Sequence, residues 1–101
     1  MKVVITRSAF KDLAAVWSHI AADSIDAADR VREEFYDAIR KLADAPGIGH
    51  RRLDVANKSY RFWSVYSYLI AYRVQGETLY VSRVVHGARD VGNVMRGRRR
   101  R

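Results

Sequence analysis

The chain has 101 residues, which is enough for one domain with a modest hydrophobic core. Hydrophobic residues make up 49% of it and cysteine is absent, which argues against disorder and excludes disulfides and thiolate metal sites. The formal net charge is +8, but five arginines in the last six residues account for most of it and leave +3 for residues 1–95.

A short strand and a helix are expected first. Residues 3–5 are β-branched, as is typical of strands. After them, apolar side chains recur every three or four positions, which predicts one apolar stripe along a helix that Ser8 caps. The stripe consists of Phe10, Leu13, Ala14, Trp17, Ile20 and Ala21. We therefore expect Trp17 to belong to the core.

A second helix follows almost at once. Ser24 or Asp26 can cap it, a new apolar stripe runs as far as Leu42, and Pro46 ends it. The link between the two helices, residues 22–25, is too short for anything but a helical hairpin.

The second half of the chain predicts a sheet. Residues 47–59 have no apolar period and indicate a basic loop, whereas the residues after them are rich in aromatic and β-branched side chains. A tight turn at Gln75 and Gly76 separates the last two strands. The three expected strands cover about residues 60–65, 68–74 and 78–86. Residues 90–95 then predict one last helical turn.

The order β-α-α-β-β-β indicates an α+β domain at residues 1–95, followed by a disordered arginine-rich tail at 96–101. Three antiparallel strands form the sheet, the N-terminal strand joins at one side, and the helical hairpin covers one face. The strands are apolar on both faces, so the second face also needs cover. A partner is favoured over the chain's own helices and tail as that cover.

Several kinds of site are excluded. The three histidines are scattered without metal-ligand spacing, and no glycine-rich phosphate loop is present, so neither a metal nor a cofactor is expected. No apolar run approaches the about 20 residues of a membrane helix. The N-terminus becomes charged too early for a signal peptide. These patterns favour a cytoplasmic protein without membrane contact.

His86 is the candidate for proton transfer, because it ends a strand and stands among arginines. The arginines expected near it, which could stabilise phosphate charge, are Arg61, Arg83 and Arg89. The structural alternative pairs Arg83 or Arg89 with Asp54 or Asp90 and bonds His86 to the backbone. This alternative is favoured, because a lone histidine more often serves structure than catalysis and no second acid or base is evident.

Four motifs follow the helical hairpin in a fixed order. They are Leu42-Ala43-x-x-Pro46-x-x-Gly49, Tyr60-Arg61, Tyr68-x-Ile70-x-Tyr72-Arg73 and Arg83-Val84-x-His86-Gly87-Ala88-Arg89-Asp90. Together they resemble the ParE branch of the RelE/ParE toxins from bacterial type II toxin–antitoxin pairs, from Met1 to about Met95. The resemblance implies a cytosolic toxin that is neutralised by a cognate antitoxin, which wraps an extended or helical segment around the toxin's sheet and helices.

The resemblance also implies one of two activities. ParE-like members inhibit DNA gyrase, whereas RelE-like members cut messenger RNA on the ribosome with basic residues plus a tyrosine or histidine. In the RelE-like alternative, Arg61, His86 and Arg89 would be catalytic, but the C-terminal tyrosine of that pattern is absent. The gyrase interpretation, which requires binding and no catalytic residue, is therefore favoured.

Binding surfaces follow from the same interpretation. The expected contacts with antitoxin or target are Arg61, Trp63, Tyr72, Arg83, His86, Arg89 and Asp90. The tail is not part of the family pattern, and its arginines could bind nucleic acid through counterion release. These residues are Arg96, Arg98, Arg99, Arg100 and Arg101. A third hypothesis is a non-toxic basic module that docks on nucleic acid through this tail.

Overall fold

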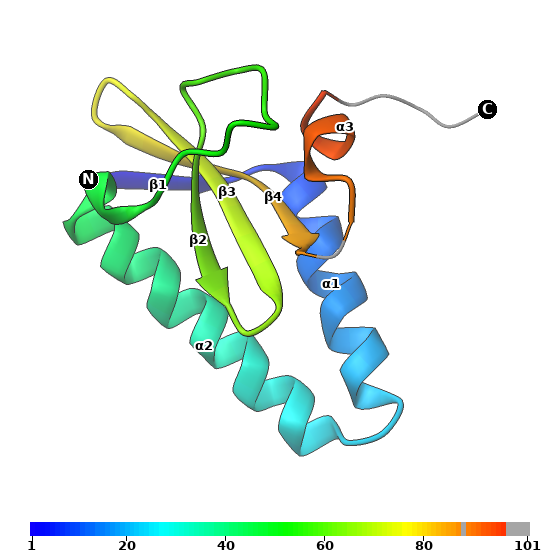
Figure 1. The fold of residues 1–101 in the computed structure, drawn as a ribbon. Helices are drawn as coiled ribbons and strands as arrows, with labels where there is room; N and C mark the ends of the chain where they lie inside the picture. The colour runs from blue at the N-terminus through cyan, green and yellow to red at the C-terminus, as the bar shows by residue number, and fades with distance from the viewer. Residues whose placement is uncertain (88, 97–101) are drawn as a thin grey trace.

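A computed structural model describes residues 1–87 and 89–96 and confirms the α+β fold that the sequence predicts (Figure 1). The elements are β1 (Lys2–Ile5), α1 (Arg7–Ala21), α2 (Ile25–Asp44), a 3-10 turn (Pro46–Ile48), β2 (Arg61–Val65), β3 (Tyr68–Gln75), β4 (Thr78–His86) and α3 (Val91–Met95). The strands lie in the order β1-β4-β3-β2, with β1 parallel to β4 and the other pairs antiparallel. The N-terminal strand therefore joins the antiparallel part of the sheet at one side, as expected.

The two long helices begin at hydroxyl side chains. α2 is capped by the predicted Ser24 and ends just before Pro46. α1 is capped by Thr6 and not by the predicted Ser8. The Thr6 hydroxyl also donates to the Ser82 carbonyl oxygen at 2.9 Å, so β4 holds this cap in place. A contact with a distant strand thus decides where α1 begins. The residues around Thr6 do not reveal this contact.

The helical hairpin covers one face of the sheet (Figure 1). Phe35 and Leu42 of α2 and Ile70 and Val81 of the central strands have at most 1% of their surface exposed. Full burial of such side chains stabilises the fold by roughly 1.5–3 kcal/mol each. This cluster is the main core, and it fixes the orientation of both helices.

The chain itself covers part of the second face, which the sequence analysis assigned to a partner. Val55 of the loop before β2 and Val91 of α3 pack on Phe62 of the sheet. Gly92 allows this approach, because a Cβ there would lie 2.3 Å from the carbonyl oxygen of Asp54. Neither the loop nor the five-residue helix has an apolar period long enough to predict such packing.

The carboxylate of Asp12 on α1 accepts hydrogen bonds from the part of β4 that extends beyond the end of β1. Asp12 accepts hydrogen bonds from Nε of Arg83 at 2.7 Å and from the backbone N–H of Val84 at 2.9 Å. This hydrogen bond to Asp12 raises the pKa of the Arg83 guanidinium. The sequence suggested Asp54 or Asp90 as the arginine's partner, whereas the partner is a residue 71 positions away along the chain.

A buried hydroxyl fixes the turn after α2. Tyr72 has no exposed surface, and its hydroxyl donates to the Pro46 carbonyl oxygen at 2.6 Å and accepts from the Gly49 N–H at 2.9 Å. Burial raises the pKa of this phenol. A Cβ at Gly49 would lie 2.3 Å from the same hydroxyl, so the position requires glycine. Arg61 adds a hydrogen bond to the Gly49 carbonyl oxygen at 2.9 Å.

Asp12→Ala should lower the free energy of unfolding by about 2 kcal/mol, because it removes the acceptor from two partly buried donors. Urea denaturation followed by circular dichroism measures this change. Lys11→Ala is the matched control on the same helix, and its exposed side chain should matter by less than about 0.5 kcal/mol. Equal stability of the two variants would contradict the role given to Asp12.

Tyr72→Phe should lower the free energy of unfolding by about 1–3 kcal/mol, because Gly49 N–H and Pro46 C=O lose their buried partner. The effect should depend on pH. The folded-state pKa of Tyr72 is raised, so the stability from its protonated hydroxyl is complete below the unfolded value of about 10 and is lost as pH rises above it.

The wild type should therefore lose stability above pH about 10 more steeply than Tyr72→Phe does. Urea midpoints on both sides of that pH test this expectation. Tyr36→Phe is the control, since its side chain on α2 is only partly buried. Parallel pH profiles for wild type and Tyr72→Phe would contradict the role assigned to the buried phenol.

Candidate functional site

His86 and Arg89 lie together at the end of β4, as the sequence suggested. They line a cavity of about 270 Å³ between β4 and α1, opposite His19. The ring of Tyr68 stands nearly perpendicular to that of His86, with 5.2 Å between ring centroids. Two imidazoles and a guanidinium line this space together with the carboxylate of Asp12, so it offers both donors and acceptors to a polar group.

Two other predicted contact residues have structural roles. Asp90 caps α3 by accepting the Asn93 backbone N–H at 3.3 Å. Arg83 is held by Asp12, and 29% of its side chain is exposed. Both can orient the segment around His86, but their polar atoms are already engaged within the chain.

Arg61 and Tyr72 lie at a distance from His86. Arg61 pairs with Tyr72 on one side of β3, and His86 pairs with Tyr68 on the other side. Four residues along a strand span about 13 Å, and two strand spacings add about 10 Å across the sheet. The catalytic set of the RelE-like alternative, Arg61 with His86 and Arg89, is therefore not gathered around one phosphate. Tyr72 is fully buried, and its hydroxyl supports the turn at 46–49.

Trp63 belongs to a separate region on the edge strand β2. The ammonium of Lys41 lies 5.1 Å from the centroid of the Trp63 ring, close enough for a cation–π interaction. A cavity of about 370 Å³ beside it is also lined by Glu34 and Tyr66. A hydrogen bond with Glu34 raises the pKa of Tyr66, whose φ of 55° is unusual for a bulky residue.

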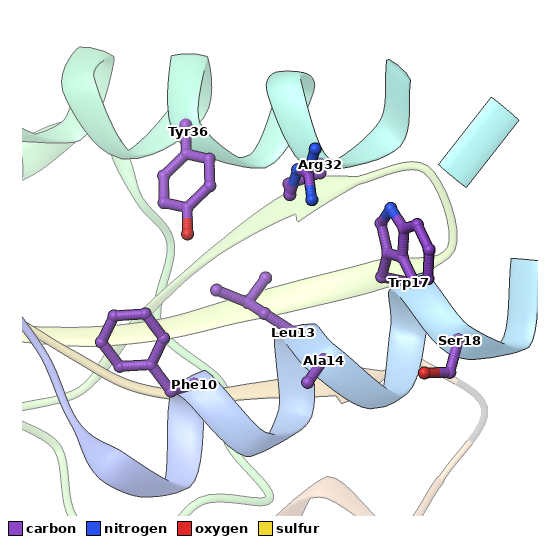
Figure 2. Close-up of a pocket in the computed structure, with 7 residues that line it drawn as sticks. All are labelled: Phe10, Leu13, Ala14, Trp17, Ser18, Arg32 and Tyr36. Carbon is purple, nitrogen blue, oxygen red and sulfur yellow. The ribbon is translucent and has the colours of Figure 1, made fainter. Parts of the chain in front are cut away.

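A further cavity, which the sequence did not predict, lies between α1 and α2. Its volume is about 290 Å³, and it is lined by Phe10, Leu13, Ala14, Trp17, Ser18, Arg32 and Tyr36. Figure 2 shows Phe10 and Leu13 projecting from α1 and Tyr36 from α2 into the space between the helices. Phe10 is 53% exposed, which is high for a phenylalanine.

Asp29 holds the rim of this helical cavity in place. Its carboxylate accepts from the Trp17 indole N–H at 2.9 Å and from the Arg32 guanidinium at 3.1 Å. The Arg32 guanidinium lies 6.0 Å from the centroid of the Trp17 ring. The sequence places Phe10 on the apolar stripe and predicts that Trp17 belongs to the core, but both lie at the open edge of the stripe. The presence of two large aromatic residues, Phe10 and Trp17, at one edge of the stripe is the sequence signal that could have indicated an exposed binding surface.

Neither a metal-ligand cluster nor a membrane-spanning helix is found in the described part of the chain. Residues 1–87 and 89–96 contain no group of three side chains that could hold a metal ion. They also contain no helix long and apolar enough to cross a membrane. Of the tail arginines, Arg96 is exposed after α3, and Arg98, Arg99, Arg100 and Arg101 lie outside the described residues.

Comparison with known proteins identifies the family. Residues 3–91 match the family model described as the ParE toxin of the type II toxin–antitoxin system parDE. A solved structure of the chromosomal ParDE system from P. aeruginosa shares the fold, with a TM-score of 0.72 and 19% identity over 85% of this chain and 95% of that one. No curated protein sequence matches closely enough to add a further relative. The match over nearly the whole folded region shows that the chain belongs to the ParE toxin family of type II toxin–antitoxin systems.

Proposed function

We propose that this ParE-family chain acts in the cytoplasm by binding and inhibiting DNA gyrase, and that its cognate antitoxin neutralises it. The family match over residues 3–91 carries the proposal. Catalysis of RNA cleavage would need a base, an acid and cations around one phosphate. The separation of Arg61 from His86 supports a toxin that works by contact and not by chemistry.

The helical cavity is the surface that best suits the antitoxin. An apolar segment with an aliphatic or aromatic anchor would cover Phe10 and Trp17, which otherwise remain partly exposed. The net charge of +8 favours an acidic partner. Trp63, His86 and Arg89 remain proposed contacts at the sheet, with Arg61, Tyr72, Arg83 and Asp90 supporting them from within. The tail arginines from Arg96 onward remain a proposed contact with nucleic acid.

The purified chain should inhibit supercoiling by DNA gyrase and increase the amount of cleaved DNA trapped on the enzyme. Addition of the antitoxin encoded beside it should restore supercoiling. His86→Ala should still inhibit gyrase, with at most the roughly 10-fold loss expected for one binding contact, because the proposal gives His86 a contact and no proton to transfer. Unchanged supercoiling with the wild-type chain would reject gyrase as the target. A loss of toxicity by about 10² or more in His86→Ala, together with messenger cleavage by wild type, would favour the RelE-like activity.

Phe10→Ala should weaken antitoxin binding by roughly 10-fold to 100-fold, because it removes an anchor at the mouth of the helical cavity. Isothermal titration calorimetry with the purified antitoxin measures this loss. Ile25→Ala is the matched control, since Ile25 is a 60% exposed apolar residue at the start of α2 and away from the cavity. Equal affinities for the two variants would place the antitoxin elsewhere.

A further inference from the structure

Arg73 lies between two tyrosine rings on the second face of the sheet. Its guanidinium carbon is 5.9 Å from the ring centroid of Tyr60 and 5.9 Å from that of Tyr80. Arg73 of β3 pairs with Tyr80 of β4, and Tyr60 directly precedes β2 on the other side. The three side chains therefore form a row across neighbouring strands, which we call the Tyr–Arg–Tyr row.

The guanidinium of Arg73 has no polar partner among residues 1–87 and 89–96. Its Nε is buried and makes no hydrogen bond. Other partly buried arginines are engaged: Arg52 pairs with Asp54, Arg61 donates to the Gly49 carbonyl oxygen, and Arg83 pairs with Asp12. A buried donor without an acceptor is unfavourable and rare in native structures, which makes Arg73 exceptional in this fold.

Aromatic contacts, and no hydrogen bonds to described residues, hold this guanidinium in place. Both tyrosine rings lie within the range of a cation–π interaction with it, so its terminal N–H donors are the part still available to a ligand. A planar fork of donors matches the oxygen atoms of a phosphate or a carboxylate. Because both rings restrain the side chain, less conformational entropy is lost when such a ligand binds.

The row lies on the part of this face that the loop and α3 leave uncovered, beside one exposed lysine. The loop and α3 cover the other half of this face, over Phe62. Next to the Tyr–Arg–Tyr row, Lys2 of β1 pairs with Thr78 of β4, and Lys2 is exposed. Glu77 in the adjoining turn is the nearest acid by sequence, and it forms no ion pair with Arg73 in the described residues. Tyr60 and Tyr80 are themselves only partly buried.

We propose that this open half of the second face binds single-stranded nucleic acid. Arg73 donates to a backbone phosphate, Lys2 adds charge, and the exposed parts of Tyr60 and Tyr80 contact bases. A carboxylate would also fit Arg73, but aromatic rings beside a cation on a sheet suit stacked bases, and the net charge of +3 on residues 1–95 suits a polyanion. The proposal goes beyond gyrase inhibition and does not rest on it.

Binding of a fluorescein-labelled oligothymidylate to the full-length chain, measured by anisotropy over a range of salt concentrations, tests this site. Arg73→Gln should weaken binding about 10-fold or more and reduce the slope of log K against log salt by about 0.7, the value for one phosphate contact of a single strand. Arg30→Gln is the matched control, because it removes the same charge from the exposed surface of α2. It should weaken binding by less than about threefold.

Equal losses in Arg73→Gln and Arg30→Gln would overturn the proposal, because the oligonucleotide would then be responding to net charge alone. Polyglutamate that binds as tightly, with the same dependence on Arg73, would identify a carboxylate site and also overturn it. If Arg73→Gln does not fold, the wild-type chain still gives the answer by NMR. The guanidinium N–H signals of Arg73 should shift on addition of oligothymidylate, and signals that all stay in place at saturation would reject the site.

Discussion

The contact between Asp12 and β4 determines how this small domain is assembled. β1 has only four residues, whereas β4 has nine, so β1 cannot satisfy the whole edge of β4. Where β1 ends, the cap and a side chain of α1 make the hydrogen bonds to β4 instead. The Thr6 hydroxyl donates to the Ser82 carbonyl oxygen, and Asp12 accepts from the Val84 N–H. The position of α1 follows from these two contacts. One side of α1 then forms the cavity with His86, and another side forms the helical cavity with α2.

A chain of about 100 residues has little material with which to cover both faces of a four-stranded sheet. Here the hairpin of α1 and α2 covers one face, while a loop and a short helix cover part of the other. Gly92 and Gly49 allow the chain to pack this closely, because a side chain at either position would collide with a neighbouring residue. The uncovered remainder of the second face is where Arg73 and its two tyrosines lie.

What the sequence predicts correctly is mostly local. The helical stripes, the cap at Ser24, the stop at Pro46 and the aromatic strands all depend on neighbouring residues, and all appear in the structure. The cap at Thr6 and the partner of Arg83 depend on residues more than 70 positions away. Periodicity and spacing contain no information on such contacts.

The candidate site was predictable only in part, for the same reason. His86 and Arg89 line the same cavity because they are only three positions apart in the sequence. Arg61 was grouped with them by residue type, but strand order places β3 between β2 and β4, and register moves Arg61 further along the sheet. The helical cavity was missed because an apolar stripe shows which residues are apolar, without showing how far the partner helix reaches across them.

The arginines show why charge alone is a poor guide to function in this chain. Net charge counts each of them equally, yet Arg52, Arg61 and Arg83 direct their donors to acceptors within the fold. These three stabilise a loop, a turn and a helix–strand contact. Arg73 differs because aromatic rings hold it without satisfying its donors. A cation that the fold orients but leaves unsatisfied retains its capacity to bind an anion, and that distinction, more than the total of +8, singles out the surface that we propose for nucleic acid.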